Sequence, residues 1–190
     1  MRDLHRLPTD LPVPVDDGAC THLQGMQFPA ISLRSTADRM INLREVAMTP
    51  TVFFFYPRTG RPEELAPKGW DKIPGARGCT PQSCGFRDQL SRFKARGVQV
   101  FGVSSQTSDF QKEFVVRNHI TYEILSDEKY LLTEALRLPT FEFNSMRLIK
   151  RAALFVQASV IEKVFYPVFP PNRNAEDVLA WLSRDWKETA

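Results

Sequence analysis

Hydrophobic residues of this chain gather in short runs that polar, proline-rich and glycine-rich stretches separate. Residues 51–56 form a continuous β-branched and aromatic run, and residues 98–103 form a second apolar run. Runs of this length and composition are typical of strands buried on both faces of a sheet. Pro57 ends the first run. The two runs therefore predict the centre of a buried sheet.

Helical periodicity lies between and after these runs. Phe86, Leu90 and Phe93 recur at helical spacing, and Gly97 is placed to end that helix. Residues 108–111 have the form of a capping box, with Ser108 at its start. Residues 127–136 predict a further helix, and Asn174 is expected to cap the last one. The apolar face of that last helix is Val178, Leu179, Trp181 and Leu182.

Shorter apolar stretches complete the predicted sheet. Residues 28–33 and 40–43 predict two short strands, with a brief helix over 44–47, and residues 122–125 predict another strand. Residues 151–156 and 160–165 predict a hairpin. Strands and helices alternate through the middle of the chain, which predicts an α/β, thioredoxin-like fold with a central mixed sheet flanked by helices.

Two stretches fall outside this pattern. Residues 1–18 contain three prolines and paired aspartates, so they predict an extended N-terminal arm. Residues 58–77 are rich in Gly, Pro and charge and predict a long inserted loop. Long loops in compact domains are often functional. We expect residues 19–190 to form a single domain that carries this loop.

Composition narrows the function. The net charge of +3 is too weak to indicate nucleic-acid binding, and no glycine-rich phosphate loop is present. The start of the chain lacks the apolar core of a signal peptide, and no stretch has the length of a membrane span. Three cysteines do not make a disulfide framework. We expect a cytoplasmic protein without membrane association.

The candidate chemistry is a cysteine pair, Cys79 and Cys84, five positions apart where the loop enters a helix. A helix start favours a thiolate, and a second thiol gives an oxidised sulfur a partner. If Cys79 lies inside the helix, the first turn must melt before the sulfurs can bond, because five positions separate side chains by ~7.5 Å and ~140°. If Thr80 is the N-cap, the two cysteines occupy positions that a staple contact brings together.

The remaining cysteine and the three histidines carry weaker signals. Cys20 stands alone and is interpreted as incidental. His5, His22 and His119 are scattered, and no cysteine–histidine group has metal-ligand spacing, so no metal site is predicted. Arg151 opens an apolar strand. It is either a solvated edge charge or a fixed guanidinium that stabilises a thiolate and holds a polar oxygen substrate.

Residues 54–57 and the run Gly-Cys-Thr-Pro-Gln-Ser-Cys-Gly-Phe-Arg-Asp at 78–88, with the arginine-bearing strand 151–156, resemble the peroxiredoxins, and most closely the Q type. The resemblance implies a thiol peroxidase on a thioredoxin fold, in which Cys79 attacks a hydroperoxide and becomes a sulfenic acid. Cys84 would then resolve it as an intramolecular disulfide, and thioredoxin or a similar dithiol would reduce that bond. No cofactor is implied.

The chain departs from the family pattern in front of the reactive cysteine. The pattern has a proline seven residues before it and a Thr or Ser three before it, where this chain has Lys72 and Ala76. Pro57 matches the family proline but lies 22 residues upstream, so about fifteen residues are inserted. Thr59 is the nearest upstream hydroxyl that could replace the missing one. Pro57 and Thr59 therefore join Cys79, Cys84 and Arg151 as predicted site residues.

Two other functions use the same features. A thiol-disulfide carrier would use the cysteine pair, although such proteins typically have a Cys-x-x-Cys spacing. A non-catalytic peroxide sensor would use the same scaffold with one oxidation event. The expected partners are a hydroperoxide and a thioredoxin-like reductant, without nucleic acid, and the expected state is a monomer or weak homodimer.

Overall fold

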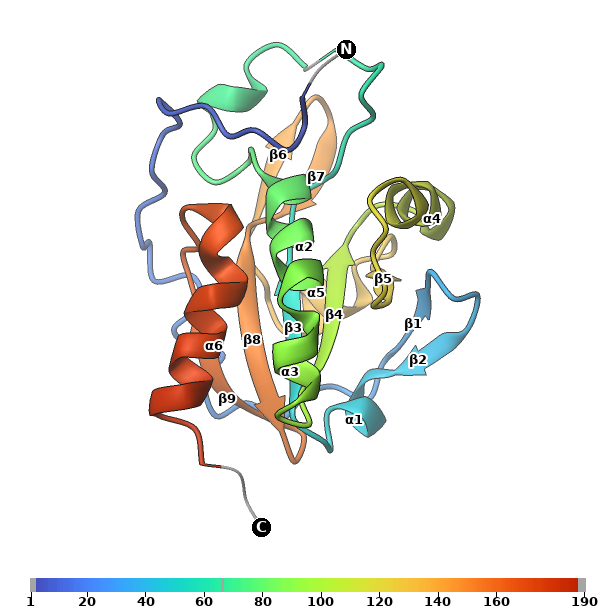
Figure 1. The fold of residues 1–190 in the computed structure, drawn as a ribbon, viewed down its shortest axis with the longest axis vertical. Helices are drawn as coiled ribbons and strands as arrows, with labels where there is room; N and C mark the ends of the chain where they lie inside the picture. Colours follow the sequence, from blue (N-terminus) through green and yellow to red (C-terminus); the bar gives the residue numbers. More distant parts are fainter. Residues whose placement is uncertain (1–2, 66, 188–190) are drawn as a thin grey trace.

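A seven-stranded mixed sheet forms the centre of the molecule (Figure 1). The computed structural model describes residues 3–65 and 67–187. The strand order is β2-β1-β5-β4-β3-β8-β9, in which β3, β4 and β5 are parallel and the other neighbours are antiparallel. The bounds are β1 (Ser32–Ser35), β2 (Met40–Asn42), β3 (Thr51–Phe55), β4 (Gln99–Ser104), β5 (Ile124–Ser126), β8 (Ala152–Gln157) and β9 (Val160–Phe165).

Every residue of the central strand β3 is buried, as its apolar run predicts. Because successive side chains of a strand point to opposite faces, β3 contributes to two separate cores. Phe53 stacks on Phe28 on one face, with ring centroids 4.6 Å apart. Phe54 stacks on Phe86 on the other face, with centroids 4.2 Å apart. The sheet is thus the middle layer of three.

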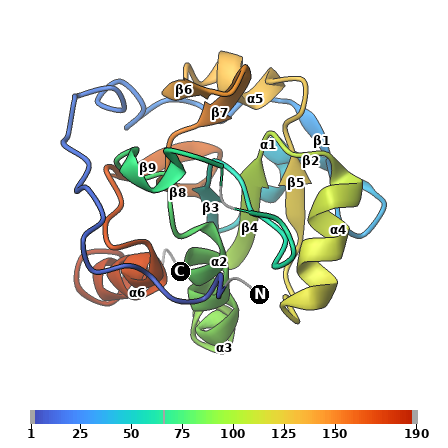
Figure 2. The same cartoon turned by 90° about the horizontal axis from the view of Figure 1, so that it is seen from above.

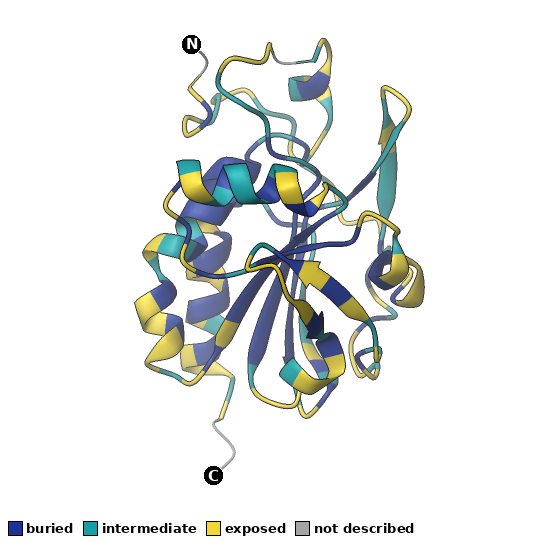
Figure 3. Ribbon diagram, turned by 90° about the vertical axis from the view of Figure 1, so that its right-hand side faces the viewer, coloured by how far each residue is buried: buried dark blue, intermediate teal, exposed yellow. Residues whose placement is uncertain are grey.

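Helices cover both faces of the sheet (Figure 2). The core on one face includes residues of α2, α3, α4 and α6, and the core on the other includes α1, α5 and the segment 20–31. The longer helices show one buried and one exposed side (Figure 3). The bounds are α1 (Leu43–Val46), α2 (Cys79–Asp88), α3 (Leu90–Lys94), α4 (Ser108–Arg117), α5 (Leu131–Ala135) and α6 (Asn174–Arg184).

A small hairpin and the inserted loop pack together beyond the sheet. β6 (Thr140–Phe143) pairs with β7 (Met146–Ile149), and the loop contains the 3-10 helix η1 (Trp70–Lys72). Trp70 of the loop lies 5.1 Å from Phe143 of the hairpin between ring centroids, in an edge-on arrangement. The loop is therefore a packed part of the molecule. Over the described ranges, no helix is long and apolar enough to cross a membrane.

Apart from the β6–β7 hairpin, the structure confirms the predicted order of elements, and it corrects several local details. Thr107, not Ser108, caps α4, because its side chain accepts a hydrogen bond from the Phe110 N–H. Asn174 is the first residue of α6 and does not cap it. The predicted strands at 28–33 and 122–125 are shifted to β1 and β5, and the helix predicted over 127–136 is the shorter α5. The β8–β9 hairpin is confirmed, and the β6–β7 hairpin was not predicted.

Candidate active site

Cys79 is the first residue of α2, at the carboxyl end of the parallel strands. Gly78 is the N-cap, so the alternative in which Thr80 caps the helix is wrong. The backbone N–H groups at a helix start carry partial positive charge, which favours an anion there. Cys79 is 4% exposed. Its sulfur is therefore held near the dipole's positive end with little access to water.

Gly78 has φ of 105°, a conformation that residues with a side chain rarely adopt. A Cβ at this position would lie 2.3 Å from Cγ of Pro171, which belongs to the 3-10 helix η2 (Pro171–Arg173). It would also lie 3.0 Å from Cδ2 of Leu7 in the N-terminal arm. A glycine is required here because both the turn and the close packing exclude a side chain.

Arg151, immediately before β8, reaches the Cys79 sulfur across the sheet edge. Its Nη2 donates to Cys79 Sγ over 3.3 Å. The same nitrogen donates to the carbonyl oxygens of Ala76 and Arg77, each over 3.2 Å, and Nε donates to the Gly75 carbonyl over 3.2 Å. Arg151 is 3% exposed, so it is not a solvated edge charge.

Among the described residues, no carboxylate bonds the Arg151 guanidinium. Within the described ranges, its hydrogen-bond acceptors are carbonyl oxygens, the side-chain oxygen of Gln82 and the Cys79 sulfur, with no carboxylate among them. A buried charge is costly unless a counter-charge is close. The thiolate form of Cys79 supplies that counter-charge, and a charge-assisted hydrogen bond favours it. This arrangement stabilises the anionic, nucleophilic state of Cys79.

Gln82 and Asn174 hold the guanidinium in place, and the sequence analysis missed both roles. Gln82 is fully buried, accepts a hydrogen bond from Arg151 Nη1, and donates through Nε2 to Asn174 Oδ1 over 2.9 Å. A polar residue three positions after Cys79 is on the same side of a helix, which was the available signal for Gln82. No such signal in the sequence marked Asn174, because it lies 92 positions after Gln82 and only the packing of the chain brings the two side chains together.

A pocket lies over Cys79, and the inserted loop forms much of its wall. Arg58, Thr59, Arg61, Glu64 and Trp70 of the loop line it, together with Leu4 of the N-terminal arm. Thr59 is 1% exposed, and its Oγ1 donates to Gln106 Oε1 over 3.1 Å. Thr59 therefore lies on the wall of the correct pocket, with its hydroxyl proton engaged by Gln106.

The two positions that depart from the family pattern behave differently. Ala76 contributes its backbone, because its carbonyl accepts from Arg151 and lies 3.6 Å from Cys79 Sγ. Lys72 is exposed in η1. Pro57 is buried directly after β3, but it is not among the residues that line the pocket over Cys79. Arg151 therefore contacts the Cys79 sulfur and Thr59 lines the pocket over it, whereas neither Arg151 nor Pro57 is a lining residue of that pocket.

Cys84 lies one turn further along α2 and is 7% exposed. Burial raises the pKa of its thiol, although the positive charge of Arg87 opposes this effect. His5 of the N-terminal arm contacts it, with Nδ1 3.8 Å from Cys84 Sγ. Both cysteines are thiols in this structure and both lie in α2, so regular helical geometry keeps their sulfurs apart.

The other sulfur and histidines lie away from Cys79. Cys20 is in the core on the opposite face of the sheet, where burial raises the pKa of its thiol to about 12. His119 is exposed just after α4, and the ring of His22 contacts the Leu136 carbonyl. In residues 3–65 and 67–187, no group of three or more His, Cys, Asp or Glu side chains could hold a metal ion.

The fold and the paired thiols define a thioredoxin-like protein with a buried, arginine-bound cysteine at a helix start. The family model described as Redoxin matches residues 23–179. The chain belongs to the Redoxin family.

Relatives of known class are peroxiredoxins. The chain is 26% identical over 159 residues to the chloroplastic peroxiredoxin Q of Suaeda salsa, a match that covers 84% of this chain and 67% of that one. It is 24% identical over 159 residues to the chloroplastic peroxiredoxin Q of Arabidopsis thaliana, covering 84% of this chain and 66% of the relative. The predicted resemblance to peroxiredoxins of the Q type is confirmed.

Solved structures share the fold. The peroxidoxin BcpB of Mycobacterium tuberculosis superposes with a TM-score of 0.70 at 20% identity, covering 86% of this chain and 98% of that one. The bacterioferritin comigratory protein of Xanthomonas campestris gives a TM-score of 0.65 at 18% identity, with 92% and 98% covered. The predicted thioredoxin-like fold is therefore confirmed.

Proposed function

We propose that this protein is a thiol peroxidase that reduces hydrogen peroxide and organic hydroperoxides through Cys79. The observation that carries the proposal is the buried guanidinium of Arg151, which has neutral oxygens around it and donates to Cys79 Sγ over 3.3 Å. Peroxide reduction requires a thiolate, and a hydrogen bond from a charged donor favours the thiolate by about 1.5–3 kcal/mol. Membership of the Redoxin family supports the same reaction.

In the first step, the Cys79 thiolate attacks one peroxide oxygen. The S–O bond forms as the O–O bond breaks, the sulfur is oxidised to sulfenic acid, and the leaving oxygen takes a proton and departs as water or an alcohol. The N–H groups at the start of α2 and the positive charge of Arg151, which bonds Cys79 Sγ, lie beside the sulfur and oppose the negative charge that develops on the oxygens. Arg151 thus acts mainly on the nucleophile.

In the second step, Cys84 attacks the sulfenic acid, which yields the Cys79–Cys84 disulfide and water. Both residues begin inside α2, and five positions of regular helix separate them by ~7.5 Å of rise and ~140° of rotation. A disulfide needs Cα atoms ~4.4–6.8 Å apart. The first turn of α2 must therefore unwind for the bond to form, and a thioredoxin-like dithiol then reduces it.

The pocket over Cys79 fits a small or narrow substrate. Arginine side chains and apolar groups such as Leu4 and Trp70 share its wall. Thr59 is proposed to help orient the peroxide, because its hydroxyl oxygen can still accept a hydrogen bond while its proton bonds Gln106. Pro57 is assigned a supporting role at the end of β3 only.

The cellular setting follows from the same chemistry. A cycle that ends with reduction by a dithiol protein needs a reducing compartment, and the cytoplasm is the simplest one. We propose that the protein acts on hydroperoxides as a monomer or a weak homodimer. The plant relatives, by contrast, are chloroplastic. Fractionation of cells that express the full chain tests the compartment.

The decisive experiment is peroxide consumption with thioredoxin, thioredoxin reductase and NADPH. We expect repeated turnover by the wild type, a loss of at least about 10³-fold in Cys79→Ser, and one oxidation event per molecule in Cys84→Ser with thioredoxin as reductant. Wild-type turnover in Cys79→Ser would refute the proposal. A wild type that consumes a single equivalent of peroxide would make the protein a sensor.

A further inference from the structure

The N-terminal arm, which we define as residues 3–18, crosses the start of α2 (Figures 1 and 2). Arg77 holds it there, because Nη2 donates to the carbonyl oxygens of Asp3 and Arg6 over 3.3 and 3.5 Å. Leu4 is 9% exposed and lines the pocket over Cys79. The arm is therefore packed against the same helical turn that carries the reactive sulfur.

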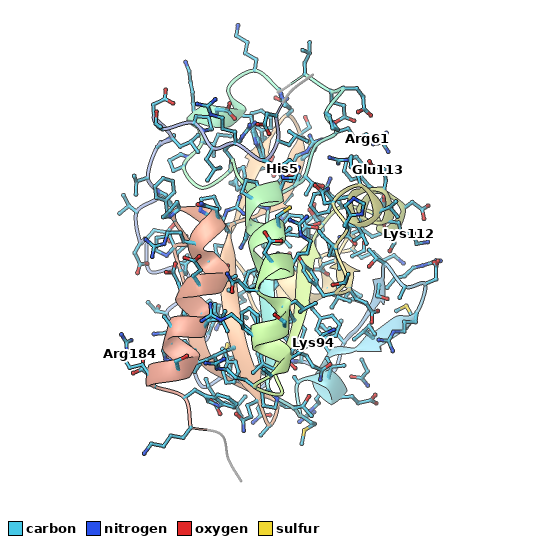
Figure 4. All side chains as sticks on the ribbon, viewed as in Figure 1. His5, Arg61, Lys94, Lys112, Glu113 and Arg184 are labelled. Carbon is cyan, nitrogen blue, oxygen red and sulfur yellow. The ribbon has the colours of Figure 1, made fainter. Side chains whose placement is uncertain are left out.

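His5 is the residue of the arm that reaches the second sulfur. Its Nδ1 lies 3.8 Å from Cys84 Sγ, within hydrogen-bond range for sulfur. Figure 4 shows the His5 side chain beside the upper end of α2. The Asp3 carboxylate accepts the backbone N–H of His5 over 2.9 Å, which fixes the turn that presents the ring. His5 is an exposed residue whose backbone is fixed by Asp3 and whose ring contacts Cys84.

Cys84 needs such a neighbour to react. Disulfide formation requires a thiolate as the attacking group. Burial raises the pKa of Cys84, so at neutral pH it is mostly the protonated thiol. Arg151 cannot serve it, because that side chain is committed to Cys79, Gln82 and the carbonyls of the loop. The proton of Cys84 thus needs an acceptor of its own.

We propose that His5 is the general base for Cys84, and that its Nδ1 accepts the thiol proton as Cys84 attacks the sulfenic acid of Cys79. This assignment rests on the peroxidase function proposed above and deepens it. His5 contacts the reacting sulfur directly, and it belongs to an arm that precedes the part of the chain matched by the Redoxin model, residues 23–179. The resolving step would thus use a group supplied from outside the matched region.

The step balances as follows. The thiol proton of Cys84 moves to His5 Nδ1, and the resulting thiolate attacks the Cys79 sulfur. The S–S bond forms, the S–O bond of the sulfenic acid breaks, and the hydroxide that leaves takes the proton from the imidazolium to become water. Cys84 is oxidised, Cys79 is reduced from sulfenic acid to disulfide, and His5 returns to its neutral state.

The surroundings of His5 allow this proton exchange. His5 and Cys84 share a cavity of about 300 Å³ that opens to solvent, with walls from α2, α6 and η2. Among the described residues, the charged or titratable groups around His5 and Cys84 come from five parts of the chain: Asp3 and Arg6 of the arm, Arg77 of the loop, Arg87 and Asp88 of α2, Arg117 of α4 with Tyr122 after it, and Glu176 of α6. Both signs of charge are therefore present around the two residues.

The test measures the resolving step alone. Reduced full-length protein is mixed with one equivalent of hydrogen peroxide in a quench-flow instrument, and intact mass with peptide mapping follows sulfenic acid and the Cys79–Cys84 disulfide. In His5→Asn, the side-chain oxygen can keep the contact but cannot accept the proton at neutral pH. We expect sulfenic acid to form at the wild-type rate and the disulfide to form about 10- to 100-fold more slowly at pH 7.

The pH profile separates a base from a structural contact. An imidazole base makes the rate of disulfide formation level off within pH 5–8. In His5→Asn, the rate should instead rise about tenfold per pH unit through that range, because it follows the thiolate fraction. His119→Asn is the matched control, since His119 is exposed and follows α4, and it should keep the wild-type profile.

Equal rates and equal profiles in wild type and His5→Asn would overturn the assignment while leaving the peroxidase function intact. A slower rate with an unchanged profile would also overturn it, because the arm would then act only by packing. A wild type that forms no sulfenic acid at all would contradict the proposed function first, and the role of His5 would fail with it. His5→Ala provides a second variant that removes the ring without adding a polar group.

Discussion

The first and second turns of α2 each bury a thiol, but they surround it differently. Cys79 meets the helix start and the Arg151 guanidinium, both of which favour an anion. Cys84 is buried, which raises the pKa of its thiol, and its sulfur contacts the imidazole of His5. The exposed fractions are nearly the same, at 4% and 7%. The two thiols therefore differ in their charged neighbours and not in their burial.

Cys20 extends the comparison to a sulfur with no role in the proposed cycle. It lies in the core beneath the other face of the sheet, and burial and the negative charges of Asp17 and Asp16 raise the pKa of its thiol to about 12. Cys20 and Cys84 thus share a raised pKa, but of the two, within the part of the chain that the structure describes, Cys84 alone has an imidazole in contact. The three thiols are similarly buried, but they differ in what surrounds the sulfur: a guanidinium at Cys79, an imidazole at Cys84 and an apolar core at Cys20.

Removing the arginine should give the largest effect on the contrast between the two turns. In Arg151→Ala, the Cys79 thiolate loses its charged donor, and we expect alkylation of Cys79 by iodoacetamide at pH 7 to slow about 10- to 100-fold, equivalent to about 1.5–3 kcal/mol. Alkylation of Cys84 should be unchanged. Mass spectrometry of the two cysteine peptides measures both rates in one sample.

The carbonyls of residues 75–77 also lose a donor in Arg151→Ala, so a second variant is needed. Arg151→Lys keeps the charge without the planar fork and should show an intermediate rate. Arg96→Ala removes a half-buried arginine that bonds Ser183 and serves as the control. If both Arg151 variants remain folded and alkylate at the wild-type rate, Arg151 does not stabilise the thiolate.

Alkaline pH should lower the free energy of unfolding through the buried thiol of Cys20. The pKa of the Cys20 thiol is about 9.0 in the unfolded chain, and burial raises it to about 12 in the folded protein. Its contribution to stability is therefore fully present below pH 9 and is lost as the pH rises toward 12, up to roughly 2–4 kcal/mol. Urea unfolding of the reduced protein at pH 8 and pH 11 measures this loss.

Cys20→Ala separates Cys20 from the other groups that titrate in this range. The variant should be about 1 kcal/mol less stable than wild type at pH 8, from the lost packing, and should lose less stability between pH 8 and pH 11. An identical alkaline loss in the variant would show that Cys20 is not the buried thiol responsible. Cys84→Ala, run beside it, tests the same effect for the second raised pKa.

The smallest effect is expected at the wall of the pocket. Thr59→Val removes a hydroxyl whose proton already bonds Gln106, so we expect kcat/KM for hydrogen peroxide to fall only about two- to fivefold. Thr59→Ser should match the wild type in steady-state assays. A loss greater than about 100-fold in Thr59→Val would mean that this hydroxyl replaces the one that Ala76 lacks.

Much of this molecule follows from local pattern. The apolar runs of β3 and β4 and the helical spacing after Cys79 predict the sheet and α2, because a buried strand and an amphipathic helix each impose their own period. The β6–β7 hairpin escaped prediction because its residues are mostly half exposed and carry weak alternation. Its turn uses Asn144 and Ser145, both with positive φ, where a glycine would have marked it.

The sequence by itself determined the class of the protein and pointed to Cys79 and Cys84 as the candidate pair, because a cysteine motif at a helix start needs only neighbouring residues. Tertiary structure decided the rest. Cys79 lies inside α2 and not before it, Arg151 is a buried partner and not an edge charge, and Gln82 with Asn174 locks that arginine. It also placed His5 on Cys84 from 79 positions away. Such contacts depend on how distant elements pack, and no local period encodes them.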